Sequence, residues 1–204
     1  MSEVMQGFPP SEPNRVSLAN WRKAPYCHWA FHHVREIIPS AEISNDPTDV
    51  WELKPDTMDT SSLGIDNAMV STDCDAIVVL HKDTLVHESY RNGMTSRDPH
   101  ILMSVSKSML GLVAGTLIER GELNEDDLIT KYLPELASTA YAGATVRDLL
   151  DMRAGVLFDE DYLATEGPIV DYRFAANWNP VPKDHEAGDL RSFMSVLTKS
   201  DGPH

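Results

Sequence analysis

Ser104 and Lys107 are the residues of this chain whose types and spacing are best suited to chemistry. They stand at the head of an apolar, helix-like run over residues 103–121, and residues three apart share one face of a helix. A serine hydroxyl becomes a good nucleophile when a neighbouring base takes its proton, and a neutral lysine amine can be that base. The spacing therefore predicts a helix that presents an activated serine without help from a histidine.

The surroundings of this pair decide whether it can react. Burial and the positive end of the helix dipole both disfavour a charged Lys107, and that dipole favours negative charge developing near Ser104. The alternative is an ordinary surface helix start, in which the serine caps the helix and the lysine stands in solvent. The apolar run, with Gly111 and Gly115 inside it, favours a buried helix packed closely against another element.

A β-hairpin is predicted before this helix. Residues 75–81 and 85–90 are rich in β-branched side chains, and residues 82–84 between them are typical of a turn. We therefore expect two strands that lead the chain towards Ser104.

Further helices are predicted after it. Gly121 is a typical helix stop. A short helix closed by proline is expected over residues 123–134. Another is expected over residues 145–152, where Thr145 and Asp148 have the spacing of a capping box.

The remaining stretches are predicted to lack regular structure. Residues 1–20 are rich in proline and serine and are expected to be loose. Residues 40–72 are predicted to form a long wrapping loop. Residues 164–179 show little periodicity and are predicted to form a loop on the substrate side. Residues 199–202 read as a polar, frayed terminus.

Four sequence blocks, in their order and spacing, resemble serine hydrolases related to class C β-lactamases, whose nucleophile motif is S-x-x-K. The blocks are residues 103–108, 119–123, 131–136 and 145–152. An earlier block, residues 29–41, is similar to the N-terminal segment of the 6-aminohexanoate-dimer (nylon-oligomer) hydrolases and their esterase-like relatives. The resemblance extends over roughly residues 20–180.

The resemblance implies a fold and a domain layout. We expect an α/β (α+β) protein with a β-lactamase/transpeptidase-like fold, in which an antiparallel sheet is flanked by helices beside a helical subdomain. Residues 1–70 would form an N-terminal extension with wrapping loops. Residues 71–204 would form the hydrolase domain, incomplete at the C-terminus.

The resemblance also implies roles for individual residues. Ser104 would be the acyl nucleophile and Lys107 its base partner, with no metal or organic cofactor. Tyr162 matches a tyrosine that contacts substrate in the dimer hydrolases, although an ordinary half-buried loop tyrosine is the alternative. Trp178 would line the same cleft or, as the alternative, anchor the core.

The chain also departs from the family pattern. The family needs a Tyr-x-Asn motif after the helical region and a later strand with a Lys-Thr-Gly-like or His-x-Gly-like triplet, and we find neither. Tyr90-Arg91-Asn92 has the right letters but precedes Ser104, so we interpret it as a chance match. We therefore expect the N-terminal portion of a longer hydrolase, catalytically incomplete, with an exposed apolar face on the Ser104 helix.

Composition limits the partners. The 204 residues include 17 basic and 32 acidic ones, and the net charge of −15 disfavours nucleic acid and anionic membranes. No stretch has transmembrane length, and the N-terminus lacks a signal pattern, so a cytoplasmic location is predicted. Cys27 and Cys74 have no motif spacing, which favours free thiols over a disulfide. The sequence is compatible with a homodimer and does not decide the oligomeric state.

A metal site is an alternative interpretation of His28, His32 and His33. His28 and His32 share one helix face, as two metal ligands would, and His33 follows. No third ligand lies near them in sequence, and packing with Trp29 and Phe31 is favoured, so no metal is expected.

The predicted function is acyl transfer to water through an acyl-enzyme. The expected substrates are small linear amides, such as 6-aminohexanoate oligomers, or simple esters. The alternatives are a carboxylesterase, a weak β-lactamase, and a non-catalytic binding module or fragment.

Overall fold

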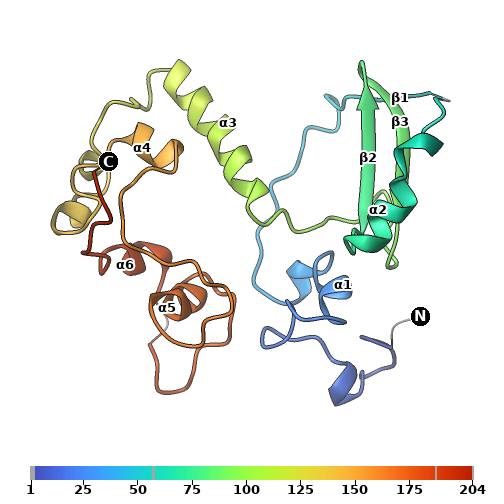
Figure 1. Cartoon of the computed structure of the whole chain (residues 1–204), viewed down its shortest axis with the longest axis horizontal. Coiled ribbons are helices and arrows are strands. Elements are labelled where there is room, and N and C mark those ends of the chain that lie inside the picture. The colour runs from blue at the N-terminus through green and yellow to red at the C-terminus, as the bar shows by residue number, and fades with distance from the viewer. Residues whose placement is uncertain (1–2, 57, 187, 204) are drawn as a thin grey trace. The chain divides into compact units, whose positions relative to one another are not determined.

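The computed structural model describes residues 3–56, 58–186 and 188–203. The chain divides into two compact units, Met1–Ile101 (unit 1) and Leu102–His204 (unit 2), and each is described by itself (Figure 1). The predicted division at residue 70 falls inside unit 1 and stays a prediction.

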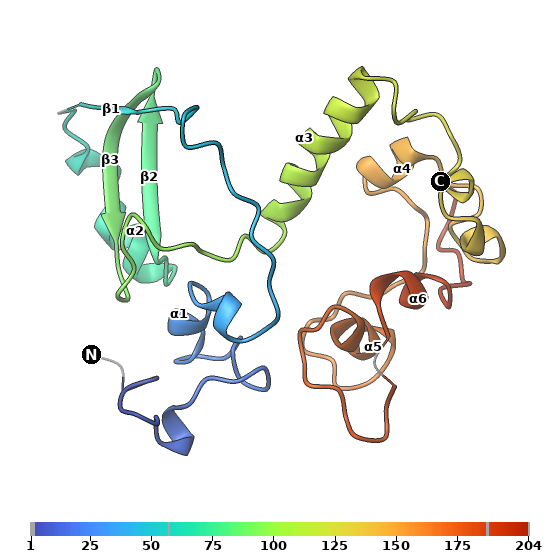
Figure 2. The ribbon, with the colours of Figure 1, turned by 180° about the vertical axis from the view of Figure 1, so that it is seen from behind.

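The hairpin of unit 1 is confirmed. Strand β2 (Ala76–His81) pairs antiparallel with β3 (Thr84–Tyr90), with a shift of register between Val79 and Leu80. Lys82 and Asp83 both have positive φ, 48° and 63°, as the two central residues of a type I′ turn require. Such a turn matches the twist of the two strands, which lie side by side in both views (Figures 1 and 2).

A third strand makes the sheet mixed. The two-residue β1 (Lys54–Pro55) pairs parallel with β3, which gives the order β1-β3-β2. The predicted α/β class is thus confirmed, while the sheet is antiparallel in its hairpin and parallel at β1.

The helices of unit 1 correct two predictions. Residues 40–72 are no continuous loop, because they contain β1 and helix α2 (Ile65–Ser71). Ile65 and Met69 are both buried in this helix, four residues apart, and this spacing was its missed signal. Residues 1–20 are also more ordered than expected, since the amide of Met5 donates to the carbonyl of Asn14 at 2.8 Å.

In unit 2 the predicted helix is α3 (Val105–Glu119). It ends as expected at Gly121, whose φ is +70°. The amide of Gly121 donates to Ile118 O at 2.9 Å, and that of Glu122 to Leu117 O at 2.9 Å. These are the two hydrogen bonds of a Schellman motif, which satisfies the last carbonyls of the helix.

Helix α4 (Val146–Leu150) is confirmed together with its capping box. The Thr145 hydroxyl accepts from the amide of Asp148 at 3.1 Å, and the Asp148 carboxylate accepts from the amide of Thr145 at 2.8 Å. The backbone amides of Thr145 and Asp148 at the helix start are thereby satisfied.

The helix predicted over residues 123–134 is wrong. Only the 3₁₀ turn Ile129–Lys131 forms there. Leu128 is extended and bridges to Thr145, the amide of Ile129 donates to Ala144 O at 2.9 Å, and that of Val146 donates to Asp127 O at 2.9 Å. Long-range main-chain pairing takes the donors and acceptors that a continuous helix would have used.

Residues 164–179 contain helix α5 (Pro168–Ala175) instead of a loop. Proline at the first helical position was the missed signal, because its fixed φ suits a helix start. The aromatic rings of Phe158, Tyr172 and Phe193 pack between α5 and α6 (Leu190–Met194). Residues 199–202 are not frayed, since Ser200 forms a β-bridge with Val156.

The remaining helices are short. They are α1 (Cys27–Ala30) and the 3₁₀ helices Glu12–Asn14, Val34–Glu36, Ser61–Leu63 and Pro134–Ser138. In unit 2, Ile129, Leu136 and Ala144 form a buried cluster. Cys27 and Cys74 are free thiols, as predicted from the sequence.

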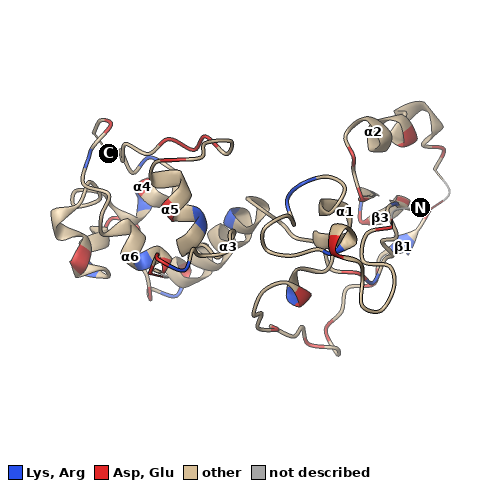
Figure 3. Cartoon of the chain, turned by 90° about the horizontal axis from the view of Figure 1, so that it is seen from below, with Lys and Arg blue, Asp and Glu red and all other residues tan. Residues whose placement is uncertain are grey.

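Charges are mixed along the chain. Basic and acidic residues are interspersed along the ribbon in both units, as Figure 3 shows. No described helix combines the length and the apolar character needed to cross a membrane.

Candidate active site

The predicted pair of Ser104 and Lys107 is brought together at the start of α3. Lys107 Nζ donates a hydrogen bond to Ser104 Oγ at 3.1 Å. Ser104 occupies the N-cap position, yet its side chain makes no capping hydrogen bond. The hydroxyl is therefore occupied with the amine rather than with the helix, which argues against an ordinary capping serine.

The backbone at this point has an uncommon conformation. Met103, directly before Ser104, has φ +47°. Positive φ is uncommon for a residue with a side chain and costs of order 1 kcal/mol, and such residues cluster at functional sites. The turn at Met103 places Ser104 at the N-cap position, directly before the first residue of α3.

The donors of the first turn are mostly used. The amides of Val105, Ser106 and Lys107 donate to the carbonyls of the residues three before them, at 3.0–3.1 Å. Within the described residues, the amide of Ser104 has no such acceptor, and it lies at the positive end of α3. A group of this kind can stabilise a developing oxyanion.

The burial predicted for this helix is wrong. The exposed apolar face, which we predicted for an incomplete hydrolase domain, is present. Ala114 is buried, but five large apolar side chains are exposed: Val105, Met109, Leu110, Leu112 and Val113. A Cβ added at Gly111 or Gly115 would meet nothing within 4 Å, so neither glycine makes the predicted close approach.

Tyr162 and Trp178 form a second pair in unit 2. Their rings stack with centroids 6.4 Å apart and planes 24° apart. The Tyr162 hydroxyl donates to Glu160 Oε2 at 2.5 Å, and this hydrogen bond raises the pKa of Tyr162. The structure thus pairs Ser104 with Lys107 by a hydrogen bond and Tyr162 with Trp178 by ring stacking. The Ser104 hydroxyl bonds to Lys107, whereas the Tyr162 hydroxyl bonds to Glu160.

His28 lies in α1, and His32 and His33, just after it, contact main-chain carbonyls and rings instead of one another's ring nitrogens. His32 Nε2 lies against the carbonyl of His28, and His33 Nδ1 lies 2.7 Å from the carbonyl of Trp29. His33 also stacks on Trp29 at 4.0 Å. Over residues 3–56, 58–186 and 188–203, no three His, Cys, Asp or Glu side chains converge as metal ligands.

A polar cluster around the buried Asp75 was not predicted from the sequence. Asn92 Nδ2 donates to Asp75 Oδ1 at 2.6 Å, and His100 Nε2 lies 3.0 Å from Asp75 Oδ2. His28 Nδ1 lies 3.7 Å from the same carboxylate. These residues are far apart in sequence and share no motif, so nothing local pointed to them. Asn92 thus has a role apart from the Tyr-x-Asn letters.

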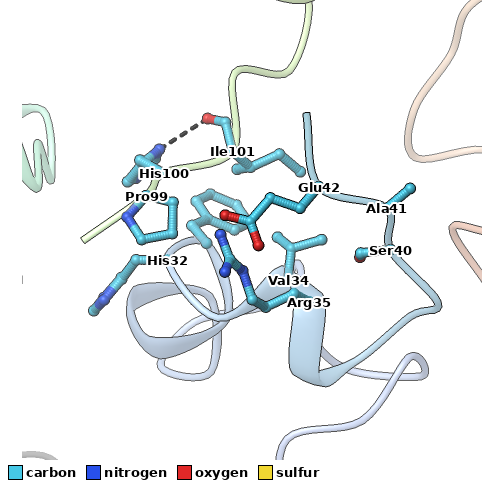
Figure 4. A pocket seen from close by; sticks show the side chains of 10 residues that line it. His32, Val34, Arg35, Ser40, Ala41, Glu42, Pro99, His100 and Ile101 are labelled. Carbon is cyan, nitrogen blue, oxygen red and sulfur yellow. Dashed lines mark hydrogen bonds between the residues drawn. The ribbon is translucent and has the colours of Figure 1, made fainter. Parts of the chain in front are cut away.

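His100 also borders a cavity of about 460 Å³ in unit 1 (Figure 4). Its other ring nitrogen, Nδ1, lies 2.8 Å from the carbonyl of Ile101. Arg35 and Glu42 line the cavity together with the apolar Phe31. The lining contains no serine–lysine pair, so this cavity lacks the chemistry found at α3.

Comparisons with known proteins assign the chain to a family. The family model described as Beta-lactamase matches residues 66–189, and the chain belongs to this family. The region includes Ser104, Lys107, Tyr162 and Trp178.

Individual relatives are more specific. The chain is 32% identical over 198 residues to the 6-aminohexanoate-dimer hydrolase of Paenarthrobacter ureafaciens, covering 96% of this chain and 50% of the relative. It is 37% identical over 81 residues to a Beta-lactamase of Escherichia coli (strain K12), covering 39% of this chain and 21% of the relative.

A solved structure supports the same assignment. A Bacillus anthracis protein, provisionally described as a 6-aminohexanoate-dimer hydrolase, superposes with a TM-score of 0.78 at 25% identity, covering 95% of this chain and 53% of that one. The predicted β-lactamase-like fold and family resemblance are thus confirmed. The chain spans about half the length of the 6-aminohexanoate-dimer hydrolases it matches.

Proposed function

We propose that the protein is a serine hydrolase that cleaves small linear amides or esters, with Ser104 as nucleophile and Lys107 as its base. The observation that carries this proposal is the 3.1 Å hydrogen bond between Lys107 Nζ and Ser104 Oγ at the start of α3. The dimer-hydrolase relatives support an amide of the 6-aminohexanoate type as substrate.

The reaction proceeds in two acyl transfers. Neutral Lys107 takes the proton of Ser104 as Oγ attacks the substrate carbonyl carbon, and a tetrahedral oxyanion forms near the helix start. The C–N or C–O bond then breaks, and the leaving amine or alcohol takes the proton from Lys107. Water attacks the acyl-enzyme, gives a proton to Lys107, and releases the acid. Ser104 recovers its proton from Lys107.

The pair of aromatic rings supplies a surface for the substrate. Tyr162 is 49% exposed, and its ring lies on Trp178, so a flat amide or a methylene chain can pack against it. We propose substrate contact for both residues, although Trp178 acts chiefly as the support of the Tyr162 ring.

The nucleophile is tested by covalent labelling. Intact mass after exposure to a fluorophosphonate should show one adduct, located at Ser104 by peptide mapping. Ser104→Ala should remove it, and Lys107→Ala should slow it by about 10²–10⁴-fold, the usual contribution of a general base. Ser106→Ala and Ser108→Ala are matched controls from the same helix and should label normally. Equal labelling of the wild type and Ser104→Ala would show that Ser104 is not the nucleophile. A folded wild type without an adduct would show that the Ser104–Lys107 pair does not activate the serine in this chain.

The substrate class is tested by parallel assays. Because the chain is expected to be catalytically incomplete, we expect slow release of 6-aminohexanoate from its linear dimer, followed by mass spectrometry, alongside slow hydrolysis of p-nitrophenyl acetate. The 81-residue match to a Beta-lactamase makes the β-lactam nitrocefin the third substrate. Nitrocefin turnover exceeding that of both linear substrates would replace our proposal with a β-lactamase. A cytoplasmic location stays a prediction, which fractionation of cells tests.

A further inference from the structure

Arg173 of α5 is a buried cation held by main-chain oxygens. Its residue is only 6% exposed. Its Nη1 donates to Ala164 O at 2.7 Å and its Nη2 to Asp161 O at 3.1 Å, while Nε is buried with no partner in the described part of the chain. Burying a charge without an anion is costly, so a residue in this position has to provide something that an apolar side chain could not.

The two carbonyls lie on either side of Tyr162. The guanidinium therefore holds the turn that carries this tyrosine at both of its ends. The turn is closed further by the amide of Ala164, which donates to Asp161 O at 3.1 Å, and by that of Leu163, which donates to Asp161 Oδ1 at 2.9 Å.

The main chain of Arg173 holds the other ring of the pair. Its carbonyl accepts from the amide of Trp178 at 2.7 Å and from that of Asn179 at 3.3 Å. One residue thus fixes the turn of Tyr162 through its side chain and the turn of Trp178 through its backbone. The stacked arrangement of the two rings depends on both turns being held at once.

We propose that Arg173 is a positioning residue, which sets the Tyr162–Trp178 rings as a surface for the chain of a linear amide. This inference rests on the proposed function and names how that site is held. The planar fork of arginine reaches two carbonyls at once, whereas a lysine amine is a single point donor on a flexible stem. Arg173→Lys therefore keeps the charge and loses the two-point hold.

The test is a binding measurement that needs no catalysis. In a Ser104→Ala background, tryptophan is replaced by 5-fluorotryptophan, and the ¹⁹F resonance of Trp178 is assigned with Trp178→Phe. Titration with the linear dimer of 6-aminohexanoate should move this resonance saturably. Arg173→Lys should weaken the apparent affinity by about tenfold, which is the size of one aromatic contact. Arg153→Lys, an exposed arginine of the same unit, should bind like its parent.

A second variant keeps the inference falsifiable if Arg173→Lys fails to fold. Arg173→Gln carries no buried charge, cannot reproduce the two-point hold, and should show the same tenfold loss. Tyr162→Ala leaves both carbonyls in place and should cause the same loss, and its combination with whichever Arg173 variant folds should lose no more than either single one. An unmoved Trp178 resonance would overturn the inference, as would unchanged affinity in a folded Arg173→Lys variant or additive losses in the double variant. Failure of the proposed function is seen separately, as absent labelling of Ser104.

Discussion

Two polar clusters, one in each unit, differ in burial and in the number of their partners. The side chain of Asp75 is 5% exposed and has three polar side chains around it, from Asn92, His100 and His28. The pair of Ser104 and Lys107 is exposed and shares one hydrogen bond. A buried carboxylate destabilises the fold unless its hydrogen-bond partners are in place, whereas an exposed pair contributes little to stability and stays accessible to a reactant. We therefore expect stability to depend on the first cluster and chemistry on the second.

Removing the buried acceptor of the Asp75 cluster should have the largest effect on stability. Asp75→Ala leaves the donor of Asn92 and the ring of His100 without their carboxylate, although water reaches both because they are exposed. We expect a loss of about 2 kcal/mol in the free energy of unfolding, measured with urea at pH 7. Asp49→Ala, at an exposed loop position, is the control and should stay within about 0.5 kcal/mol of the wild type. An equally small change for Asp75→Ala would remove the contrast between the clusters.

Acid should weaken the same cluster. Burial by itself would raise the pKa of Asp75, but the hydrogen bonds from Asn92 and His100, together with nearby His28, hold the pKa below its ordinary value. A carboxyl with a depressed folded pKa stabilises the protein above its unfolded pKa, about 3.9, and that contribution is lost as the pH falls through the folded pKa. The free energy of unfolding should decline in this range, and Asp75→Asn should decline less steeply. Parallel curves for the two proteins would assign the acid effect to other groups.

The capping box of α4 should have an intermediate effect. Thr145→Ala removes one of its two reciprocal hydrogen bonds and should cost about 1 kcal/mol in thermal or urea unfolding. Thr145→Ser keeps the hydroxyl and should recover most of that loss, while Thr198→Ala at an exposed position should have almost none. If the serine variant were as unstable as the alanine variant, packing of the methyl group would explain the cost instead of the cap.

The smallest effect on stability is expected at the candidate nucleophile. Ser104→Ala removes an exposed hydroxyl that caps nothing, so the free energy of unfolding should change by less than about 0.5 kcal/mol. Circular dichroism during urea unfolding measures this on the same samples used for labelling. A loss above about 1 kcal/mol would mean that Ser104 supports the fold, and lost labelling could then reflect unfolding rather than chemistry.

Local patterns predicted the elements whose signals are short-range. The hairpin, the Gly121 stop and the Thr145 cap each depend on residues within a few positions of one another, and all three formed as expected. The helix expected over residues 123–134 failed because its donors and acceptors pair with residues 144–146, which no local pattern contains. Helix α5 was missed although Pro168 marked its start, since its apolar spacing is weak.

The sequence by itself determined the catalytic candidates, because Ser104 and Lys107 stand three apart in a helix and that spacing brings their side chains together wherever the helix lies. It also determined the family, through blocks whose order is fixed along the chain. Only the tertiary structure decided that Asp75 joins Asn92 and His100, and that Arg173 holds the turns of Tyr162 and Trp178. Those contacts link residues that are not neighbours in sequence, and they form because folding buries Asp75 and Arg173 and brings hydrogen-bond partners within their reach.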